Sequence, residues 1–252
     1  MAGRPPFLGG RGERRVPGAK AARRSPADGH ALLIGGQVVE AVFFDMDGLL
    51  VDSERVWLEI ETDVMARLGA QWTPAHQAHL VGGSMERTVD YMLAVSGSDV
   101  PAETVREWMT GGMVRRLSAG VHVMPGASEL LDALRAENVP VGLVTSSLKE
   151  IADAVLKGVG RDRFDVVVTA DDVARTKPDP EPYLTAARLL GVEPVRCVVL
   201  EDSPNGVAAA TAAGCAVVAV PSLLAVDPAP GRLVVPSLEL LGVADLRALI
   251  TV

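Results

Sequence analysis

VVEAVFFDMDGLLVDS, residues 38–53, is the stretch of sequence that decides the fold. Its first half, Val38–Phe44, is rich in β-branched and aromatic residues, which is typical of a strand buried on both faces. Similar short runs recur at Val139–Val144, Phe164–Thr169, Arg196–Leu200, Ala216–Val220 and Leu233–Val235. Helical patterns lie between most of these runs, at Gly126–Glu137, Glu181–Leu190 and Asn205–Ala213. This alternation predicts an α/β fold, a doubly wound parallel sheet with helices on both faces.

Helical patterns replace strand signals in the long interval after residue 53, at Ser53–Leu68, Ser84–Val95 and Ala102–Leu117. The first of these segments places its apolar residues on one stripe, namely Trp57, Ile60, Val64 and Leu68. A structureless loop of this length is implausible inside a compact domain. We therefore expect residues 54–121 to form an all-helical domain, inserted into a core that comprises residues 38–53 and 122–252.

Residues 1–37 differ in composition from the rest of the chain. They contain seven basic and two acidic residues, are rich in Gly, Pro and Ala, and show no sustained hydrophobic period. Such a segment buries too little apolar surface to offset its ordering entropy, so we expect a disordered basic extension. Three interpretations stay open: a non-conserved or wrongly assigned start, an Arg-rich transit peptide, and a tail that contacts acidic partners.

The overall composition is that of an ordinary globular protein, with 48% hydrophobic and 22% charged residues. A net charge of -8 disfavours binding to nucleic acid or to an anionic membrane, because phosphate groups would repel most of the surface. The two cysteines, Cys197 and Cys215, lie inside apolar runs and suit a reducing compartment. No uninterrupted apolar stretch reaches the length of a membrane span. We expect a cytoplasmic protein with neither nucleic-acid nor membrane partners.

Two carboxylates follow the first predicted strand directly. Asp45 and Asp47 stand beyond the carboxyl end of a buried strand, where open α/β sheets bind ligands. Taken alone, the pair is more often a solvated acidic turn. A calcium-binding EF-hand loop is excluded, because apolar Leu50 and Val51 occupy the later ligand positions.

Polar residues also follow three other predicted strands. Thr145 and Ser146 end the second strand, where hydroxyls and free N–H groups would cradle a phosphate or simply cap the next helix. Lys177 lies in a proline-fixed turn after the third strand, although a lone lysine is more often solvated. Glu201 and Asp202 end the fourth strand, where Asp202 could also serve as a helix cap.

The combination is more informative than its parts. If the strand ends bring Asp45, Asp47, Glu201 and Asp202 together, each like-charged pair about 4 Å apart costs about 4 kcal/mol at an effective dielectric constant near 20. Such a cluster needs a divalent cation. Oxygen ligands without clustered His or Cys favour Mg²⁺ over Zn²⁺.

Four motifs resemble, in order and spacing, those of the haloacid dehalogenase superfamily of phosphotransferases: DMDGLLVDS (45–53), LVTSS (143–147), TKPDP (176–180) and LEDSPNG (200–206). The resemblance covers the chain from Val38 onward. The helical segment 54–121 resembles the α-helical cap of the subgroup that includes β-phosphoglucomutase and many small sugar-phosphate phosphatases. The resemblance implies a Mg²⁺-dependent phosphomonoester phosphatase with a Rossmann-like core and a mobile cap.

The resemblance also implies a role for each motif residue. Asp45 would be the nucleophile that forms an aspartyl-phosphate, and Asp47 would be the general acid and base. Thr145, Ser146 and Lys177 would hold the phosphoryl oxygens. The implied Mg²⁺ ligands are Asp45, the main-chain carbonyl of Asp47, and Asp202, with Glu201 a direct ligand or acting through water.

Comparison with the patterns of individual subgroups reduces the number of reactions that we expect. Asp47 favours phosphoryl transfer over dehalogenation, because a halide leaving group needs no proton. A phosphonate hydrolase would need a lysine in the cap, and residues 54–121 contain none. Mutases of the subgroup carry an arginine where Met85 stands here, with Arg87 two residues along, so we prefer hydrolysis to a sugar phosphomutase. A catalytically silent regulatory or binding homologue is the third alternative.

The substrate is expected to be a small phosphorylated metabolite: a hexose, pentose or deoxysugar phosphate, or a nucleotide such as FMN. Candidate substrate contacts in the cap are Trp57, Gly83, Met85 and Arg87. Trp57 is equally compatible with the core of the cap, and His76 and His79 are more consistent with surface positions. A monomer or a dimer is expected.

Overall fold

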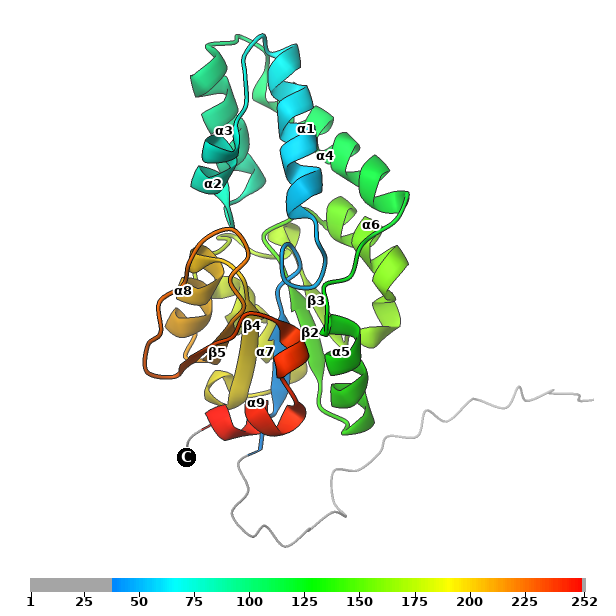
Figure 1. Ribbon diagram of the computed structural model, residues 1–252, viewed down its shortest axis with the longest axis vertical. Helices are drawn as coiled ribbons and strands as arrows, with labels where there is room; N and C mark the ends of the chain where they lie inside the picture. The colour runs from blue at the N-terminus through cyan, green and yellow to red at the C-terminus, as the bar shows by residue number, and fades with distance from the viewer. Residues whose placement is uncertain (1–37, 251–252) are drawn as a thin grey trace, which may run out of the picture. The chain divides into compact units, whose positions relative to one another are not determined.

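The computed structural model of the protein describes residues 38–250, and the basic extension predicted for residues 1–37 lies outside the described residues. Six strands form one parallel sheet in the order β3-β2-β1-β4-β5-β6 (Figure 1). The strands are β1 Ala41–Phe44, β2 Val141–Val144, β3 Val166–Val168, β4 Cys197–Glu201, β5 Ala216–Ala219 and β6 Arg232–Val234. The predicted doubly wound parallel sheet is confirmed, although β1 begins three residues later than the apolar run that predicts it.

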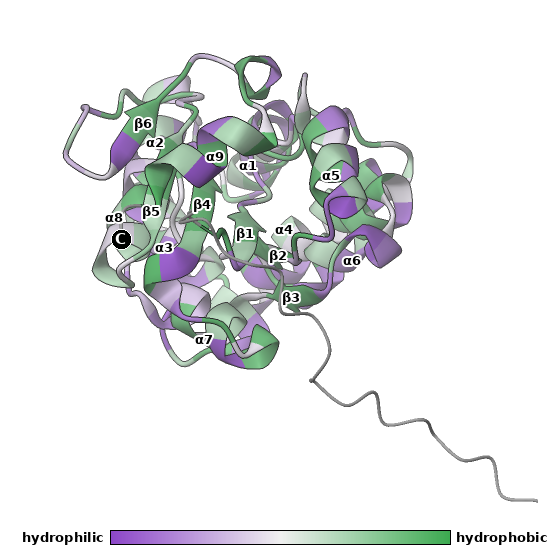
Figure 2. Ribbon diagram, turned by 90° about the horizontal axis from the view of Figure 1, so that it is seen from below, coloured by the Kyte–Doolittle hydropathy of each residue, from purple (hydrophilic) through white to green (hydrophobic). Residues whose placement is uncertain are grey.

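Helices cover both faces of the sheet. They are α5 Ala127–Ala136, α6 Lys149–Val159, α7 Glu181–Leu190, α8 Pro204–Ala212 and α9 Val243–Leu249, with 3₁₀ turns η1 Arg161–Arg163, η2 Ala170–Asp172, η3 Pro194–Arg196 and η4 Leu238–Leu240. Val42 and Phe44 of β1 belong to the apolar core that includes α5, α6 and α9, whereas Ala41 and Phe43 belong to the core shared with α7 and α8. Figure 2 shows the hydrophobic strands between these two groups of helices. Because both faces are buried, the strands carry continuous apolar runs rather than alternating ones.

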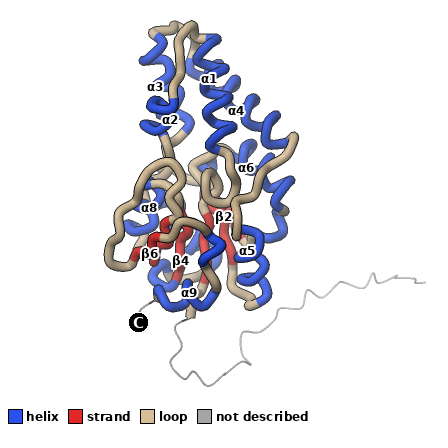
Figure 3. Tube along the Cα trace, viewed as in Figure 1, coloured by secondary structure: helices blue, strands red, loops and turns tan. Residues whose placement is uncertain are grey.

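Four further helices connect β1 to α5: α1 Glu54–Arg67, α2 Pro74–Leu80, α3 Met85–Ser96 and α4 Ala102–Ser118. These four helices, called the helical insert below, lie beyond the carboxyl ends of the strands (Figure 3). Ile60 of α1 and Met109 of α4 are buried where the two helices contact each other. A Cβ atom at Gly112 would lie 2.8 Å from Ile60 Cγ2, so the missing side chain permits this close approach. The insert therefore has a packed interior, which is continuous with the apolar cluster on one face of the sheet.

Helix lengths and apolarity also bear on membrane contact. Among residues 38–250, every helix is too short or too polar to cross a lipid bilayer.

Gly126 marks a tight contact between two segments of the core. It precedes α5 with a φ of +82°, in the left-handed region that favours glycine. A Cβ atom at this position would lie 2.3 Å from the backbone nitrogen of Glu239 and 2.5 Å from the carbonyl carbon of Leu238. Backbone atoms cannot move aside as a flexible side chain can, so only glycine fits.

We predict that Gly126→Ala lowers the free energy of unfolding by about 3 kcal/mol, because it adds a backbone clash to left-handed strain. Gly191→Ala is the matched control: its φ is +71°, but a Cβ atom there would meet no atom of the described residues within 4 Å, apart from its chain neighbours. This control should lose only about 1 kcal/mol, from strain alone. Urea denaturation of the two variants measures both values, and equal losses would contradict the proposed clash.

Candidate active site

The carboxyl ends of three neighbouring strands form the floor of the site. Strand β1 lies between β2 and β4, and the order of the strands reverses here, which makes this a topological switch point. Asp45 follows β1, Thr145 follows β2, and Glu201 ends β4. All three side chains are buried. The structure thus brings together residues that are far apart in the sequence.

A buried ion-pair network centres on Lys177, in the loop before α7. Its Nζ atom lies 2.5 Å from Asp45 Oδ1, 2.6 Å from Glu201 Oε1 and 2.8 Å from the carbonyl oxygen of Val144. Although burial alone would lower it, the two neighbouring carboxylates raise the pKa of Lys177 above its usual value. Tyr183 donates a 2.5 Å hydrogen bond to the same Glu201 oxygen. Lys177 is therefore a fixed cation in the centre of the site.

Three buried carboxylates could hold a metal ion. Asp45, Glu201 and Asp202 each offer one oxygen, and these atoms lie within 4.8 Å of one another. Burial and the neighbouring Glu201 carboxylate raise the pKa of both Asp45 and Asp202. With only the Lys177 ammonium beside them, three ionised carboxylates leave two negative charges uncompensated. A divalent cation with a preference for oxygen ligands, such as Mg²⁺, fits this donor set.

Two glycines make room for the carboxylates. A Cβ atom at Gly206, in the first turn of α8, would lie 1.8 Å from Glu201 Oε1. A Cβ atom at Gly48 would lie 2.3 Å from Asp202 Oδ2. Any side chain at either position would displace a carboxylate of the cluster, so both glycines belong to the architecture of the site.

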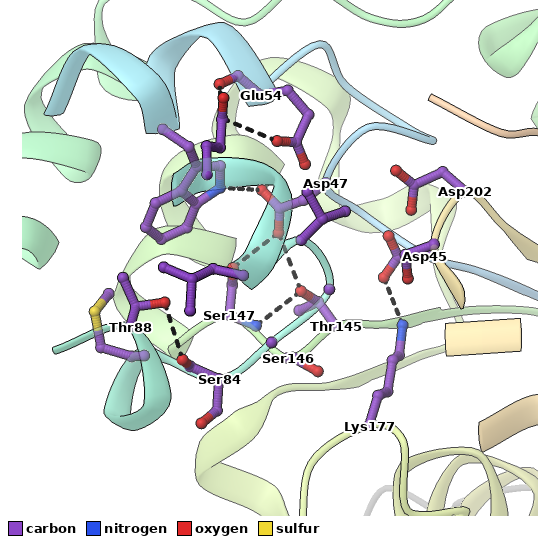
Figure 4. Close-up of a pocket in the computed structure, with 18 of the residues that line it drawn as sticks. Asp45, Asp47, Glu54, Ser84, Thr88, Thr145, Ser146, Ser147, Lys177 and Asp202 are labelled. Atoms are coloured by element: carbon purple, nitrogen blue, oxygen red, sulfur yellow. Dashed lines mark hydrogen bonds and ion pairs between the residues drawn. The ribbon is translucent and has the colours of Figure 1, made fainter. Parts of the chain in front are cut away.

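Asp47 faces the other side of the pocket from the carboxylate cluster (Figure 4). Its Oδ1 atom accepts hydrogen bonds from Ser53 Oγ at 2.7 Å and from the indole Nε1 of Trp57 at 3.0 Å. Its Oδ2 atom accepts from Ser147 Oγ at 2.8 Å and from Thr145 Oγ1 at 3.4 Å. Donors from both the core and the helical insert thus fix this carboxylate. The backbone hydrogen bonds between described residues leave the main-chain carbonyl of Asp47 free for another ligand.

Hydroxyl groups line the floor between Asp47 and Lys177. Thr145 Oγ1 accepts a 2.9 Å hydrogen bond from the backbone N–H of Ser147. Ser146 Oγ is buried and has no hydrogen-bond partner among residues 38–250. A buried hydroxyl without a partner is costly unless a ligand satisfies it. Ser146 is therefore a ready donor for a phosphate oxygen.

One pocket, open to solvent, joins this floor to the helical insert. Trp57, Gly83 and Met85, three of the candidate substrate contacts, line it. Arg87, the fourth, does not: it is exposed and donates to the carbonyl oxygen of His79 at 3.2 Å. Arg87 lies away from the expected substrate position because α3 turns this side chain outward.

His79 is exposed as expected, whereas His76 is half-buried, with its ring centroid 4.9 Å from that of Trp72. Neither histidine lines the pocket.

Two glutamates of α1 face the pocket from the helical insert. Burial, followed by repulsion from Asp47, raises the pKa of Glu54 to about 8. Burial raises the pKa of Glu61 to about 7, despite the 2.9 Å hydrogen bond from Trp72 Nε1 that opposes the shift. Gln77 of α2 donates to Glu54 Oε2 at 3.2 Å and to its backbone carbonyl at 2.7 Å. These polar groups form the wall opposite the hydroxyl groups of Thr145, Ser146 and Ser147.

Asn205 connects the core to the helical insert. Its Nδ2 atom donates to the carbonyl oxygens of Val81 and Gly82, at 3.3 Å and 3.2 Å. A Cβ atom at Gly82 would lie 2.6 Å from Ser203 Oγ, so the two segments approach as closely as glycine allows. The loop between α2 and α3 is thereby held over the pocket.

Sequence reasoning missed several of these residues, namely Ser53, Glu54, Glu61, Gln77, Ser147, Tyr183 and Asn205. Ser53 and Ser147 stand inside quoted motifs, and their hydroxyl groups beside the expected acid were a usable signal. Glu61 and Gln77 lie on amphipathic helices, where a polar residue ordinarily indicates a solvent-facing position. Only the packing of the helices reveals that they are buried.

Comparisons with known proteins agree with this geometry. The sequence profile of haloacid dehalogenase-like hydrolases matches residues 42–220. Hexitol phosphatase B of Escherichia coli O157:H7 is 34% identical over 212 residues, which cover 82% of this chain and 94% of that protein. CbbY from Rhodobacter sphaeroides, solved in complex with phosphate, superposes with a TM-score of 0.76 at 27% identity, over 83% of this chain and 99% of that one. β-Phosphoglucomutase from Clostridium difficile gives a TM-score of 0.74 at 25% identity, over 84% and 97%.

The buried Glu61 predicts an unusual dependence of stability on pH. Its pKa is raised from 4.5 in the unfolded chain to about 7 in the folded protein. The folded state therefore binds the proton more tightly, and the stability that this proton provides is lost as the pH rises from about 4.5 to about 7. Glu61→Gln removes this titration. The free energy of unfolding of Glu61→Gln minus that of wild type should therefore be about 2 kcal/mol larger at pH 8.5 than at pH 5.

Asp63→Asn makes the same chemical change at an exposed position of α1 and should show no such trend. Denaturation of the three proteins at both pH values measures the difference. A pH-independent difference for Glu61→Gln would mean that Glu61 is solvated.

Asn205→Ala should raise the KM about tenfold, because two hydrogen bonds of about 1 kcal/mol each no longer hold the 81–84 loop over the pocket. Asn205→Asp keeps the shape but cannot donate, so it should have the same effect. Steady-state kinetics with a phosphomonoester measure both variants. Wild-type kinetics for Asn205→Asp would show that donation by this side chain is not needed.

Proposed function

Because this chain belongs to the haloacid dehalogenase-like hydrolases, we propose that it hydrolyses phosphomonoesters of small metabolites in a Mg²⁺-dependent reaction through an aspartyl-phosphate. The chain is a phosphatase of this family. The proposed aspartyl-phosphate mechanism rests on one observation: two carboxylates, those of Asp45 and Asp47, lie on opposite sides of one pocket. Asp45 lies in the cluster beside Lys177, whereas Asp47 is held by hydroxyl and indole donors.

Asp45 is assigned as the nucleophile. Lys177 binds its Oδ1 atom, which leaves Oδ2 to attack the phosphorus. A bond forms between this oxygen and phosphorus while the bond from phosphorus to the ester oxygen breaks. Water then attacks the aspartyl-phosphate, and inorganic phosphate leaves. Dividing one displacement into two steps is the advantage of a covalent intermediate.

Asp47 is assigned as the general acid and base. It gives its proton to the departing ester oxygen and later takes one from the attacking water. Its hydrogen bonds from Ser53, Trp57 and Ser147 hold the carboxyl group at a fixed position over the floor of the pocket. The transferring phosphoryl group would be held by Thr145, Ser146 and Lys177. The positive charge of Lys177 would offset the negative charge of the phosphoryl oxygens.

The residues that would hold Mg²⁺ are Asp45, Asp202 and the main-chain carbonyl of Asp47. When bound there, Mg²⁺ supplies the remaining positive charge that the phosphoryl oxygens require. Glu201 has one oxygen bonded to Lys177 and Tyr183 and the other within reach of the Ser203 hydroxyl at 3.2 Å. We therefore assign Glu201 to orienting Lys177 and to the metal through water, rather than to direct coordination.

Residues 54–121 are proposed to act as a cap domain on a core of residues 38–53 and 122–252. Closure of a cap excludes bulk water and completes a catalytic site. The pocket has walls from both parts, and Trp57 of the cap contacts the catalytic acid directly, which supports this division. The two connections, near Ser53 and Val121, are the proposed hinges.

The substrate class is a sugar phosphate or a similar metabolite, as the name of the hexitol phosphatase relative suggests. The alternative of a sugar phosphomutase has less support, because a mutase must bind a second phosphate. Among the described residues that line the pocket, the only Lys, Arg or His is Lys177. A cytoplasmic monomer or dimer completes the proposal, and its two buried free cysteines suit a reducing compartment.

Asp45→Asn should lower phosphate release by at least about 10³-fold, because the amide cannot act as the nucleophile. The measurement is phosphate release from p-nitrophenyl phosphate and from hexose phosphates, with Mg²⁺ or with EDTA. Chelation should abolish release by the wild type, and added Mg²⁺ should restore it. Circular dichroism checks that the variant is folded.

The same panel includes β-glucose 1-phosphate with detection of glucose 6-phosphate. Formation of glucose 6-phosphate without net phosphate would favour the mutase. Substantial residual activity of folded Asp45→Asn would refute the assignment of the nucleophile.

A further inference from the structure

The wall of the pocket opposite the phosphate-binding residues carries two carboxyl groups, which are negatively charged above their raised pKa values of about 8 and about 7. Glu54 and Glu61 stand two turns apart on α1, and both line the pocket together with Gln77 of α2. We call these three side chains the acidic recess. Figure 4 shows Glu54 on the same side of the pocket as Asp47, remote from Lys177. A substrate whose phosphate lies on the floor would therefore direct its leaving group toward the recess.

The acidic recess offers hydrogen-bond acceptors. Glu54 Oε2 accepts from Gln77, and Glu61 Oε2 accepts from Trp72. Within residues 38–250, the Oε1 atom of each glutamate receives no side-chain hydrogen bond. An ionised carboxylate only accepts hydrogen bonds and can take up to about four. The recess thus has free acceptor oxygens that a donor on a ligand in the pocket could use.

The recess also lacks a compensating positive charge. Lys177 is the only basic residue among the described pocket-lining residues, and Asp45 and Glu201 already surround its ammonium group. Burial raises the pKa of both recess glutamates, as expected for carboxylates without a cationic partner. Above these pKa values, a ligand group in the recess would meet uncompensated negative charge at low effective dielectric constant.

On the basis of the proposed function, we propose that the acidic recess selects the leaving group by charge. It accepts leaving groups that carry hydroxyl or ammonium donors, and it rejects those that carry a second anionic group. The preferred substrates are then monophosphates of polyhydroxy or amino alcohols. Bisphosphates and phosphorylated carboxylic acids are poor substrates, and Glu61 is a determinant of this specificity.

The test uses two pairs of phosphates that differ in a single group, assayed at pH 8, where Glu61, with a pKa of about 7, is mostly ionised. Glucitol 6-phosphate and gluconate 6-phosphate differ by a hydroxymethyl group and a carboxylate. Glucose 6-phosphate and glucosamine 6-phosphate differ by a hydroxyl and an ammonium group. For wild type, kcat/KM for gluconate 6-phosphate should be at least about tenfold below that for glucitol 6-phosphate, because of like-charge repulsion. Glucosamine 6-phosphate should equal or exceed glucose 6-phosphate.

Glu61→Gln keeps the shape and an acceptor for Trp72 but removes the charge. It should raise the kcat/KM for gluconate 6-phosphate, relative to that for glucitol 6-phosphate, at least about threefold, because the like-charge repulsion is weaker. Asp63→Asn, the exposed change on the same helix, should leave the ratio as in wild type. Equal rates for both members of the first pair in wild type would overturn the proposal, as would an unchanged ratio in Glu61→Gln.

Two readouts separate this inference from the proposed function. Hydrolysis of p-nitrophenyl phosphate, which carries no hydroxyl or ammonium donor, reports on the phosphatase reaction alone. Calorimetric binding of the same two pairs to Asp45→Asn reports on charge selection without turnover. If p-nitrophenyl phosphate is not hydrolysed but binding follows the expected order, the recess assignment stands and the proposed function fails. If p-nitrophenyl phosphate is hydrolysed but binding does not follow the expected order, only the recess assignment fails.

Discussion

The ammonium group of Lys177, placed between Asp45 and Glu201, is the interaction on which the rest of the site depends. Burying two carboxylates without a partner would be strongly destabilising, whereas the pair of ion contacts compensates them and fixes their positions. Lys177 comes from the loop before α7, so the contact joins the ends of β1 and β4 to a third segment. The same network leaves Asp202 close to both acids, which creates the excess negative charge that favours a divalent cation.

The two faces of the pocket are built from different parts of the fold, and this division organises the chemistry. The sheet supplies the charged floor, because parallel strands bring their carboxyl ends to one edge. The helical insert supplies Trp57, which donates to Asp47, and the two glutamates of α1 that line the pocket. Asn205 joins the parts through two backbone carbonyls of the insert. The residues proposed to react and those proposed to contact the leaving group therefore lie together, where the insert contacts the core.

The sequence predicts the sheet well because strands buried on both faces carry an uninterrupted apolar signal, as in Val42–Phe44. It predicts the floor because each motif follows such a strand. Helices α2, α6 and α9 were missed: α2 and α9 have only seven residues each, whereas α6 has eleven and its apolar residues were not read as a helical pattern. The insert wall was predicted less well: Trp57 lines the pocket and also packs against the apolar cluster, but its bond to Asp47 was not predicted, and Arg87 points to solvent. Such orientations depend on helix packing, which local pattern does not encode.

The hydrogen bond from Trp57 to Asp47 also places a fluorescent side chain in the pocket. The chain has three tryptophans, and Trp57 is the one whose indole N–H donates to Asp47, the proposed catalytic acid. Trp72 contacts Glu61 in the insert, and the ring of Trp108 lies 5.4 Å from the guanidinium of Arg67. Emission from Trp57 therefore depends on the charge and solvation of Asp47 and on the position of α1 above it. This arrangement gives the protein an intrinsic fluorophore at its reaction centre.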